Sequence, residues 1–247
     1  MAVQITQTTA LVTGANRGIG KALVEALLAR GARRVYATAR RRETLDALVA
    51  FGAGRVVPIE LDVTNGSQVA TLAAQAGDVT LLVNNAGVVS HMFGAFGDAA
   101  WLGAGRTEFE VNVLGTLAVT QQLAPVLASN GGGAVANVAS VASFIALPLA
   151  PTYAASKAGT HSITQYTRMA LSAQGTFVAG VYPGPVDTDM ASDIPYEKTS
   201  AREVAHAILD GLEAGQEDIL PDPMARQMGA AFFAGPKQLE QPQPAAA

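Results

Sequence analysis

The chain has 247 residues, of which 49% are hydrophobic and 15% charged, so it can bury a sizeable core and is not expected to be disordered. The formal net charge is −4, and the longest basic run is Arg40 to Arg42, which argues against a nucleic-acid partner. The absence of cysteine excludes disulfides and thiolate chemistry, and three scattered histidines show no metal-ligand spacing. Because no signal-like segment and no uninterrupted membrane-length apolar run is found, we expect a cytoplasmic protein without a membrane partner.

Short apolar runs alternate with longer amphipathic stretches along most of the chain. The runs predict strands over residues 8–12, 33–38, 56–60, 80–83, 134–138, 177–182 and 218–220. The stretches predict helices over residues 18–30, 43–51, 68–76, 105–129, 152–173 and 201–212. Continuously apolar strands indicate burial on both faces, so the pattern predicts a Rossmann-type, doubly wound parallel sheet of about seven strands in a three-layer α/β/α sandwich. We expect one catalytic, dinucleotide-binding domain over residues 1–235 and a flexible tail over 236–247.

A glycine-rich loop, Thr13-Gly-Ala-Asn-Arg-Gly-Ile-Gly20, lies between the first predicted strand and the first predicted helix. Gly14 permits a tight turn out of the strand, Gly18 lets a pyrophosphate approach the backbone, and Gly20 lets the helix pack on the sheet. The helix N-terminus then offers free N–H groups and a positive dipole end to phosphates. No Lys-Ser or Lys-Thr follows, so the loop predicts dinucleotide binding and not a P-loop. The candidate contacts are Gly14, Asn16, Arg17, Gly18, Ile19 and Gly20.

The end of the second predicted strand indicates which dinucleotide is bound. An acidic residue there would bind a ribose 2′-hydroxyl and repel a 2′-phosphate, but the strand ends in Thr38-Ala39-Arg40. Arg40 and Arg17 can both bind a phosphate through charge-assisted hydrogen bonds. The sequence therefore predicts NADP(H), with Thr38 and the two arginines among its contacts. NAD(H) is the alternative, in which both arginines are solvated surface charges.

Five separated motifs together resemble the classical short-chain dehydrogenases/reductases over roughly residues 5–212. In chain order they are the glycine loop, Asn84-Asn85-Ala86-Gly87, Asn112, Ser140 with Tyr153-x-x-x-Lys157, and Pro183-Gly184-x-x-x-Thr188. The resemblance implies a strand order of 3-2-1-4-5-6-7, with the site at the carboxyl ends of the strands. It also implies cofactor contacts from Asp62, Val63, Asn85, Ala86, Gly87, Tyr153, Lys157, Pro183, Gly184, Val186 and Thr188.

Tyr153 and Lys157 lie four residues apart on a predicted helix and therefore share one face. A free tyrosine has a pKa of about 10, and a nearby ammonium lowers it, so Tyr153 is expected to act as general acid in reduction and general base in oxidation. Ser140, just past the fifth predicted strand, can donate to the substrate oxygen. Ser143 is its rival, but thirteen residues separate Ser140 from Tyr153, as in the family.

By the resemblance, Lys157 also holds the nicotinamide ribose, and Asn112 holds a water that links Lys157 to solvent. The simpler interpretations are that Tyr153 and Lys157 only share a helix face and that Asn112 only bonds to a backbone carbonyl. The chain departs from the family after Thr188, where a short lid suggests an open site, and at its C-terminus, where the usual glycine-rich ending is absent. That departure leaves a homodimer or a homotetramer open, with pairing expected through helices 105–129 and 152–173.

The candidate substrate pocket is mostly apolar, and it consists of Val89, Phe144, Leu147, Tyr182 and Met190. No basic side chain lies among these residues, so a small, neutral, hydrophobic carbonyl or alcohol is expected as substrate. The sequence thus predicts an NADPH-dependent carbonyl reductase. The alternative is an NAD-dependent secondary-alcohol dehydrogenase of the same family, and a more remote one is a non-catalytic, redox-sensing dinucleotide-binding protein.

Overall fold

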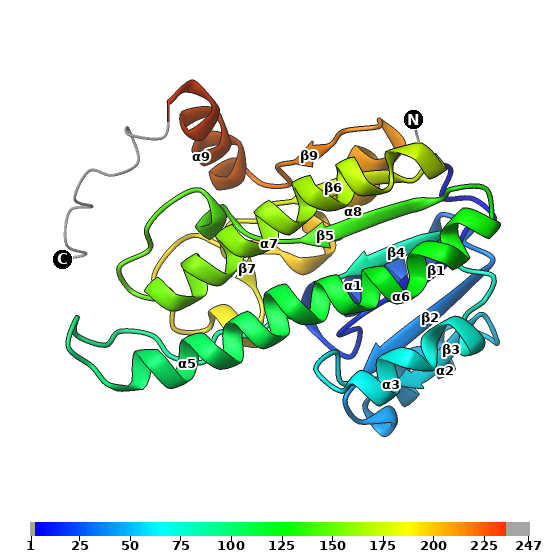
Figure 1. Ribbon diagram of the computed structural model, residues 1–247, viewed down its shortest axis with the longest axis horizontal. Coiled ribbons are helices and arrows are strands. Elements are labelled where there is room, and N and C mark those ends of the chain that lie inside the picture. The colour runs from blue at the N-terminus through cyan, green and yellow to red at the C-terminus, as the bar shows by residue number, and fades with distance from the viewer. Residues whose placement is uncertain (1–2, 236–247) are drawn as a thin grey trace.

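The computed structural model describes residues 3–235 and contains a seven-stranded parallel sheet in the order β3-β2-β1-β4-β5-β6-β9 (Figure 1). This order is the one expected, with β9 as the seventh strand. Strands β1 to β3 are added toward one edge of the sheet and β4 onward toward the other, so the order switches between β1 and β4. The strands are β1 (Thr9–Val12), β2 (Arg34–Ala39), β3 (Val56–Glu60), β4 (Leu81–Asn84), β5 (Ala134–Val138), β6 (Phe177–Val181) and β9 (Asp218–Ile219). Two short strands outside this sheet, β7 (Val186–Asp187) and β8 (Thr199–Ser200), pair with each other.

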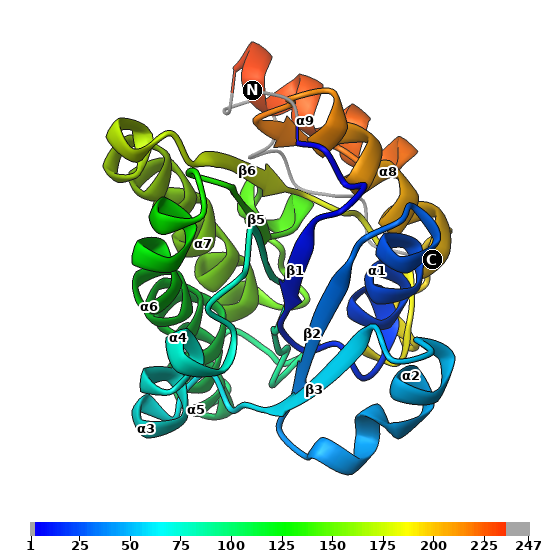
Figure 2. The ribbon, with the colours of Figure 1, turned by 90° about the vertical axis from the view of Figure 1, so that its right-hand side faces the viewer.

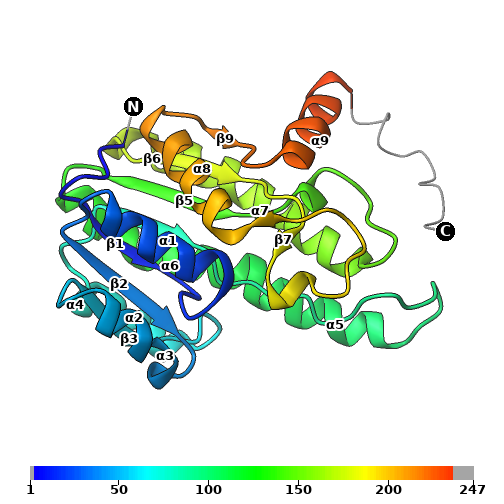
Figure 3. The same cartoon turned by 180° about the vertical axis from the view of Figure 1, so that it is seen from behind.

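Helices cover both faces of the sheet (Figure 2). One face carries α1 (Gly18–Ala29), α2 (Asp46–Phe51) and α8 (Ala201–Glu213), which lie in front in Figure 3. The other face carries α3 (Gly66–Ala70), α4 (Leu72–Gln75), α5 (Ala100–Phe109), α6 (Thr116–Ser129) and α7 (Pro151–Ala170). Neighbouring residues of β1 divide between two apolar cores, because Ala10 and Val12 pack on the α1 side and Leu11 on the α6 side. The three-layer prediction is confirmed.

Helices α5 and α6 are joined by a π-helical turn at Glu110–Gly115 and together form one helical rod, Ala100–Ser129. The rod begins five residues earlier than the predicted 105–129. Its length and mean hydropathy, 1.3 over the most apolar window, would also suit a membrane span, although half of that window is buried inside the protein. Contacts with α4, α7 and β4 account for this burial, as for a core helix packed on a sheet.

Two predicted helices are broken in the structure. Residues 43–51 form a 3₁₀ turn at Arg42–Leu45 followed by α2, and residues 68–76 divide into α3 and α4 at Thr71. The side chain of Asn65 caps α3 by accepting from the N–H groups of Ser67 and Gln68, so this helix begins two residues before the predicted start.

The C-terminal helix α9 (Pro223–Ala234) was not predicted. Its start carries a clear signal, because Asp222 caps it by accepting from the N–H of Ala225 at 2.8 Å and Pro223 occupies its first turn. The predicted tail over 236–247 lies outside the described residues, and the single domain over 1–235 stays a prediction.

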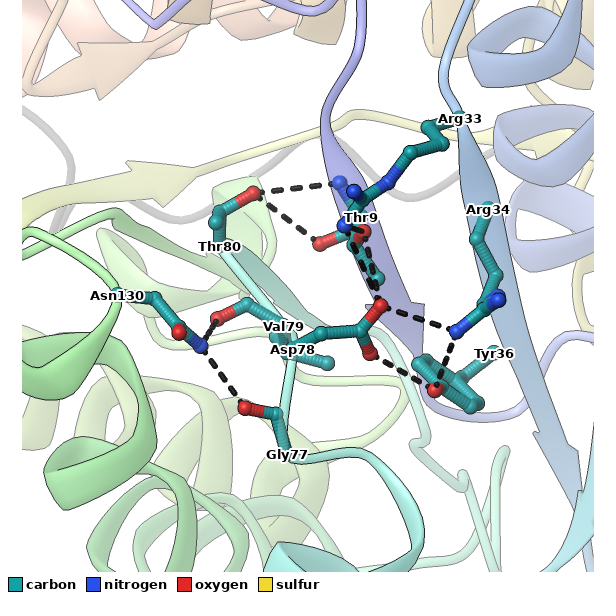
Figure 4. Close-up of polar contacts among 9 residues, drawn as sticks. All are labelled: Thr9, Arg33, Arg34, Tyr36, Gly77, Asp78, Val79, Thr80 and Asn130. Atoms are coloured by element: carbon teal, nitrogen blue, oxygen red, sulfur yellow. Dashed lines mark hydrogen bonds and ion pairs between the residues drawn. The ribbon is translucent and has the colours of Figure 1, made fainter.

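A polar cluster joins the amino ends of the strands (Figure 4). Asp78 precedes β4 and accepts hydrogen bonds from the Tyr36 hydroxyl at 2.8 Å and from Arg34 at 3.0 Å. Arg33 lies 3.3 Å from the same carboxylate and donates to the hydroxyl of Thr9 at 2.8 Å. The cluster therefore ties β1, β2 and β4 together at the edge of the sheet that is opposite the carboxyl ends.

Candidate active site

One long cavity of about 1760 Å³ runs along the carboxyl ends of the strands. Open parallel sheets usually bind ligands at this edge, close to the point where strand order reverses. The volume exceeds that of a usual small-molecule pocket, which leaves room for a dinucleotide and a substrate together. The residues just past β1 to β6 that line it include Gly14, Arg40, Leu61, Asn85, Ala139 and Pro183.

The glycine loop forms one wall of the cavity, and its backbone requires glycine. Gly14 and Gly18 have φ angles of +63° and +53°, in the left-handed region that other residues rarely adopt. A Cβ on Gly20 would lie 2.3 Å from the carbonyl oxygen of Gly14, so any side chain there would collide with the loop. The N-terminus of α1 follows without a side-chain cap, which leaves its N–H groups available to an anion.

Thr13 and Asn85 hold this loop against the end of β4. The Thr13 hydroxyl accepts from the N–H groups of Asn85 and Ala86, both at 2.9 Å. The side-chain amide of Asn85 donates to the carbonyls of Thr13 and Gly14, at 2.9 and 3.1 Å. The segment that contains Asn85, Ala86 and Gly87 is thereby fixed as a floor of the cavity, where all three were expected.

Basic side chains gather at the end of the cavity nearest β2. Arg40 and Arg41 line it, and Arg40 forms no ion pair within residues 3–235. Arg17 also lines it, but its guanidinium already contacts the carboxylate of Asp189 at 2.9 Å. Thr38 was predicted to contact the cofactor, yet its side chain is completely buried and does not line the cavity. Thr38 still belongs to strand β2, and its carbonyl accepts from the N–H of Ala15 in the glycine loop. Its side chain is therefore inside the sheet layer and not past the end of the strand.

Other predicted cofactor residues that line the cavity are Asn16, Ile19, Asp62, Val63, Pro183, Gly184, Val186 and Thr188. Gly20, also predicted as a contact, does not line it, because it packs against the carbonyl of Gly14 and the side chain of Asn85. The carboxylate of Asp62 accepts from the N–H and hydroxyl of Thr64, which orders the loop after β3. The N–H of Gly184 donates to Asp222 at 2.7 Å, so the loop after β6 is tied to the start of α9.

Tyr153 and Lys157 share one face of α7 and both line the cavity. The Nζ of Lys157 lies 5.7 Å from the centre of the Tyr153 ring and donates to the carbonyl of Val138, at the end of β5, at 2.9 Å. Gly87 lies opposite, where a Cβ would be 3.4 Å from this ammonium nitrogen. The ammonium therefore lies between the end of β5 and the floor of the cavity.

The pKa of Tyr153 moves in the direction opposite to the one expected. Burial raises the pKa of Tyr153 to about 12, a hydrogen bond with Ser140 opposes that rise, and the charge of Glu108 adds to it. Burial also lowers the pKa of Lys157 to about 8. The expected lowering by Lys157 is wrong for this state of the protein, because removal from water outweighs any attraction between the two groups.

Ser140, and not Ser143, faces the reacting end of the cavity. Ser140 follows β5, lines the cavity, and accepts from the N–H of Ala142 at 3.1 Å. The hydroxyl of Ser143 instead donates to the main-chain carbonyl of Lys157 at 2.8 Å, which holds α7 in place. Of the two serines, only Ser140 lines the cavity, which favours it as the one that could contact a substrate.

Asn112 lies in the π-helical turn and is buried beside the cavity floor. Its side chain bonds to both the N–H and the carbonyl of Val88, at 2.8 and 3.0 Å, and donates to Ser156 at 2.9 Å. Its main-chain carbonyl accepts from the hydroxyls of Thr116 and Thr160. The side chain is thus committed to protein partners, as in the simpler of the two interpretations.

Three of the five predicted substrate-pocket residues, Val89, Leu147 and Met190, line the cavity, whereas Phe144 and Tyr182 do not. Tyr182 is completely buried, and its hydroxyl contacts the Nδ1 of His161 at 2.7 Å. The ring of Phe144 stacks on Phe232 of α9, with 4.7 Å between ring centres. Both predictions were wrong because α9, whose Phe232 packs against these rings, was not predicted.

Several cavity residues were missed by sequence reasoning. Met224, Gln227 and Met228 come from α9, and Arg106 comes from the last turn of α5. Near the site, the buried carboxylates of Glu108 and Asp222 were also missed. The helix-start signal at Asp222-Pro223 could have revealed α9, but no sequence pattern distinguishes Glu108 from an exposed helical glutamate.

The comparisons with known proteins agree with this geometry. The family model described as short chain dehydrogenase matches residues 8–199. A crystal structure of a short chain dehydrogenase from Burkholderia cenocepacia in complex with NADP is 40% identical, covers 97% of this chain and 100% of its own, and has a TM-score of 0.90. A short chain dehydrogenase of Monascus purpureus is 32% identical over 78% of this chain and 69% of its own. A 3-oxoacyl-acyl-carrier-protein reductase of Synechocystis is 30% identical over 78% and 80%. The chain belongs to the short chain dehydrogenase family and is an oxidoreductase.

Proposed function

We propose that the protein is an NADPH-dependent carbonyl reductase that acts reversibly on neutral, largely apolar ketones or aldehydes. The observation that carries the proposal is the convergence of Tyr153, Lys157 and Ser140 on one cavity that has an arginine-rich end. The bound nicotinamide supplies the hydride. Side chains of the protein bind the substrate, orient it and supply the proton.

The cavity suits a dinucleotide phosphate. The left-handed glycines and the uncapped start of α1 offer backbone N–H groups without side-chain obstruction. No acidic residue ends β2, and Arg40 lies where a 2′-phosphate would be recognised. The relative from Burkholderia cenocepacia, whose structure contains NADP, supports this preference.

In the reductive direction, the hydroxyls of Tyr153 and Ser140 donate to the substrate oxygen and polarise the carbonyl. A raised pKa keeps Tyr153 protonated before reaction, so it holds the proton that the oxygen needs. As that proton leaves, the ammonium of Lys157, on the same helix face, stabilises the phenolate that remains. In oxidation the same groups act in reverse, with Tyr153 as base.

Apolar side chains dominate the substrate end of the cavity, which supports a hydrophobic substrate; they are Val88, Val89, Phe93, Ile145, Leu147, Leu149, Met190, Ile194, Met224 and Met228. Arg106 is an exposed exception. A substrate panel therefore includes a neutral ketone, its carboxylate analogue and a 3-oxoacyl thioester. A clear preference for the thioester or the carboxylate would contradict the neutral-ketone proposal.

The second candidate, an NAD-dependent secondary-alcohol dehydrogenase, is favoured by one observation. Asp189 neutralises Arg17, which leaves fewer free charges for a 2′-phosphate. Steady-state rates with NADPH and NADH distinguish the two, and Arg40→Asp should reverse a preference for NADPH. An unchanged preference in that variant would contradict the assigned role of Arg40.

We also propose that the protein forms a homodimer or a homotetramer through the rod α5–α6 and α7. Large apolar side chains are exposed on these helices, namely Leu102, Phe109, Leu114, Tyr166 and Met169. Light scattering of the purified protein gives the mass directly, and a monomer at micromolar concentration would contradict this expectation.

A further inference from the structure

Helix α5 carries a buried carboxylate that the proposed chemistry does not use. Glu108 is completely buried, and its Oε1 accepts a hydrogen bond from the main-chain N–H of Ser90 at 2.8 Å. Its Oε2 has no hydrogen-bond partner among residues 3–235. Removing a carboxylate from water without satisfying both oxygens opposes folding, so packing alone does not account for this residue.

Glu108 and Asn112 are four residues apart and reach the same segment. Asn112 bonds to both main-chain groups of Val88, and Glu108 accepts from the N–H of Ser90, two residues further on. Two side chains one helical turn apart thus take the place of a neighbouring strand for residues 88–90. Each side chain forms hydrogen bonds with main-chain N–H or C=O groups of residues 88–90, which have no strand partner within the described part of the chain.

The segment held in this way is a wall of the cavity. Val88 and Val89 line it, and Gly87 just before them lies between the functional side chains. A Cβ on Gly87 would be 3.2 Å from the Oδ1 of Asn112 and 3.4 Å from the Nζ of Lys157. A shift of this segment would therefore change both the substrate end of the cavity and the space around the ammonium.

The same carboxylate acts on Tyr153 through space. Helix α5 packs on the start of α7, where Gly105 lies against Thr152, the residue before Tyr153. Within the described chain, the charged groups that face Tyr153 are Lys157 on its own helix and Glu108 from α5, while Ser140 contributes a hydroxyl from the end of β5. The negative charge of Glu108 opposes ionisation of the phenol and so raises the pKa of Tyr153.

We propose that Glu108 is a positioning residue that, together with Asn112, clamps residues 88–90 as the wall of the substrate cavity. The effect on turnover rests on the proposed reductase function, whereas the clamp itself does not.

Two substitutions at Glu108 test the clamp. Glu108→Gln keeps an oxygen acceptor for the N–H of Ser90 but removes the charge, and Glu108→Leu removes both. Glu213→Gln is the matched control, because Glu213 is a carboxylate at the end of α8 that pairs with Arg30, away from the cavity. Hydrogen exchange of residues 86–92 is measured on the whole protein, and KM and kcat for ketone reduction with NADPH are measured at pH 7.

For Glu108→Leu we expect exchange of the 86–92 segment to accelerate about tenfold, and KM for the ketone to rise by about the same factor with a smaller change in kcat. For Glu108→Gln we expect near-native exchange and KM, because the amide oxygen still accepts from the N–H of Ser90. Native exchange in Glu108→Leu, or exchange in Glu108→Gln as fast as in Glu108→Leu, would overturn the clamp. If no variant reduces any ketone, the proposed function fails, but the exchange result still decides the clamp.

Discussion

Lys157 is predicted to make the cofactor-free protein less stable at neutral pH. The residue is 5% exposed, and burial lowers the pKa of its ammonium from 10.5 to about 8. At 1.36 kcal/mol per pKa unit, that shift corresponds to about 3 kcal/mol of destabilisation at pH 7. Replacing Lys157 with Met removes this cost but deprives the carbonyl of Val138 of a partner, which costs about 1 kcal/mol. The variant should therefore be inactive yet more stable by about 2 kcal/mol.

The pH dependence gives this prediction its sign. Between the folded pKa of about 8 and the unfolded value of 10.5, the unfolded chain binds more protons at this group, so the stability of the native protein rises with pH. The destabilisation of the native protein by the buried ammonium of Lys157 falls from about 3 kcal/mol at pH 7 to about 1.5 kcal/mol at pH 9.5. The advantage of Lys157→Met should nearly vanish over that range, and ionisation of tyrosines at pH 9.5 affects both proteins alike.

Urea unfolding of both proteins at pH 7 and pH 9.5, without cofactor, measures these differences. Lys198→Met is the control, because Lys198 is only partly buried and donates to the carbonyl of Ser192. A lysine-to-methionine change there should alter stability little at either pH. If Lys157→Met is less stable than the native protein at pH 7, or if its advantage does not depend on pH, the reasoning from burial is refuted.

Three further substitutions test other parts of the site. Tyr153→Phe should lower kcat for ketone reduction by at least about 100-fold, because the general acid is lost while packing is kept, and near-native turnover would identify another proton donor. Gly20→Ala should lower the free energy of unfolding by about 2 kcal/mol or more and abolish thermal stabilisation by NADPH, since its Cβ would be 2.3 Å from the carbonyl of Gly14; a stable variant that binds NADPH would show that the loop can shift. Asp222→Asn keeps a cap for α9 but offers an amide to the N–H of Gly184, so it should cost about 1 to 3 kcal/mol and raise KM for NADPH. Urea unfolding measures the loss of stability in Asp222→Asn, and steady-state rates at varied NADPH measure its KM. A stability and a KM equal to those of the native protein would contradict the coupling between α9 and the loop after β6.

The sheet and the nucleotide end of the cavity follow from local patterns. The apolar runs and the glycine loop predict the strands and the position of α1 because each depends on neighbours in sequence, whereas the strand order was implied by the family resemblance. Tyr182 shows where such reasoning stops. Its position just past β6 suggested the cavity, but its side chain turns inward to His161, and this choice depends on α9 packing above it.

Electrostatic properties were equally hidden from the sequence. The pairing of Tyr153 with Lys157 predicts a lowered pKa only if both are close and hydrated, whereas the fold buries them and adds the charge of Glu108. Glu108 itself looks like any helical glutamate until α7 covers it. Distances between elements, and not residue types, determine both outcomes.

The attachment of α9 at Asp222 divides the cavity into two parts that can vary separately. The groups proposed to transfer the proton and bind the dinucleotide come from residues before Asp189, while Met224 and Met228 reach the substrate end from α9, which Asp222 ties to the loop after β6 and whose Phe232 stacks on Phe144. Thioether side chains are flexible and adapt to ligands of different shape. Exchanging the α9 segment between relatives, with Asp222 retained, is therefore a route to new substrate selectivity that leaves the proposed reacting groups in place.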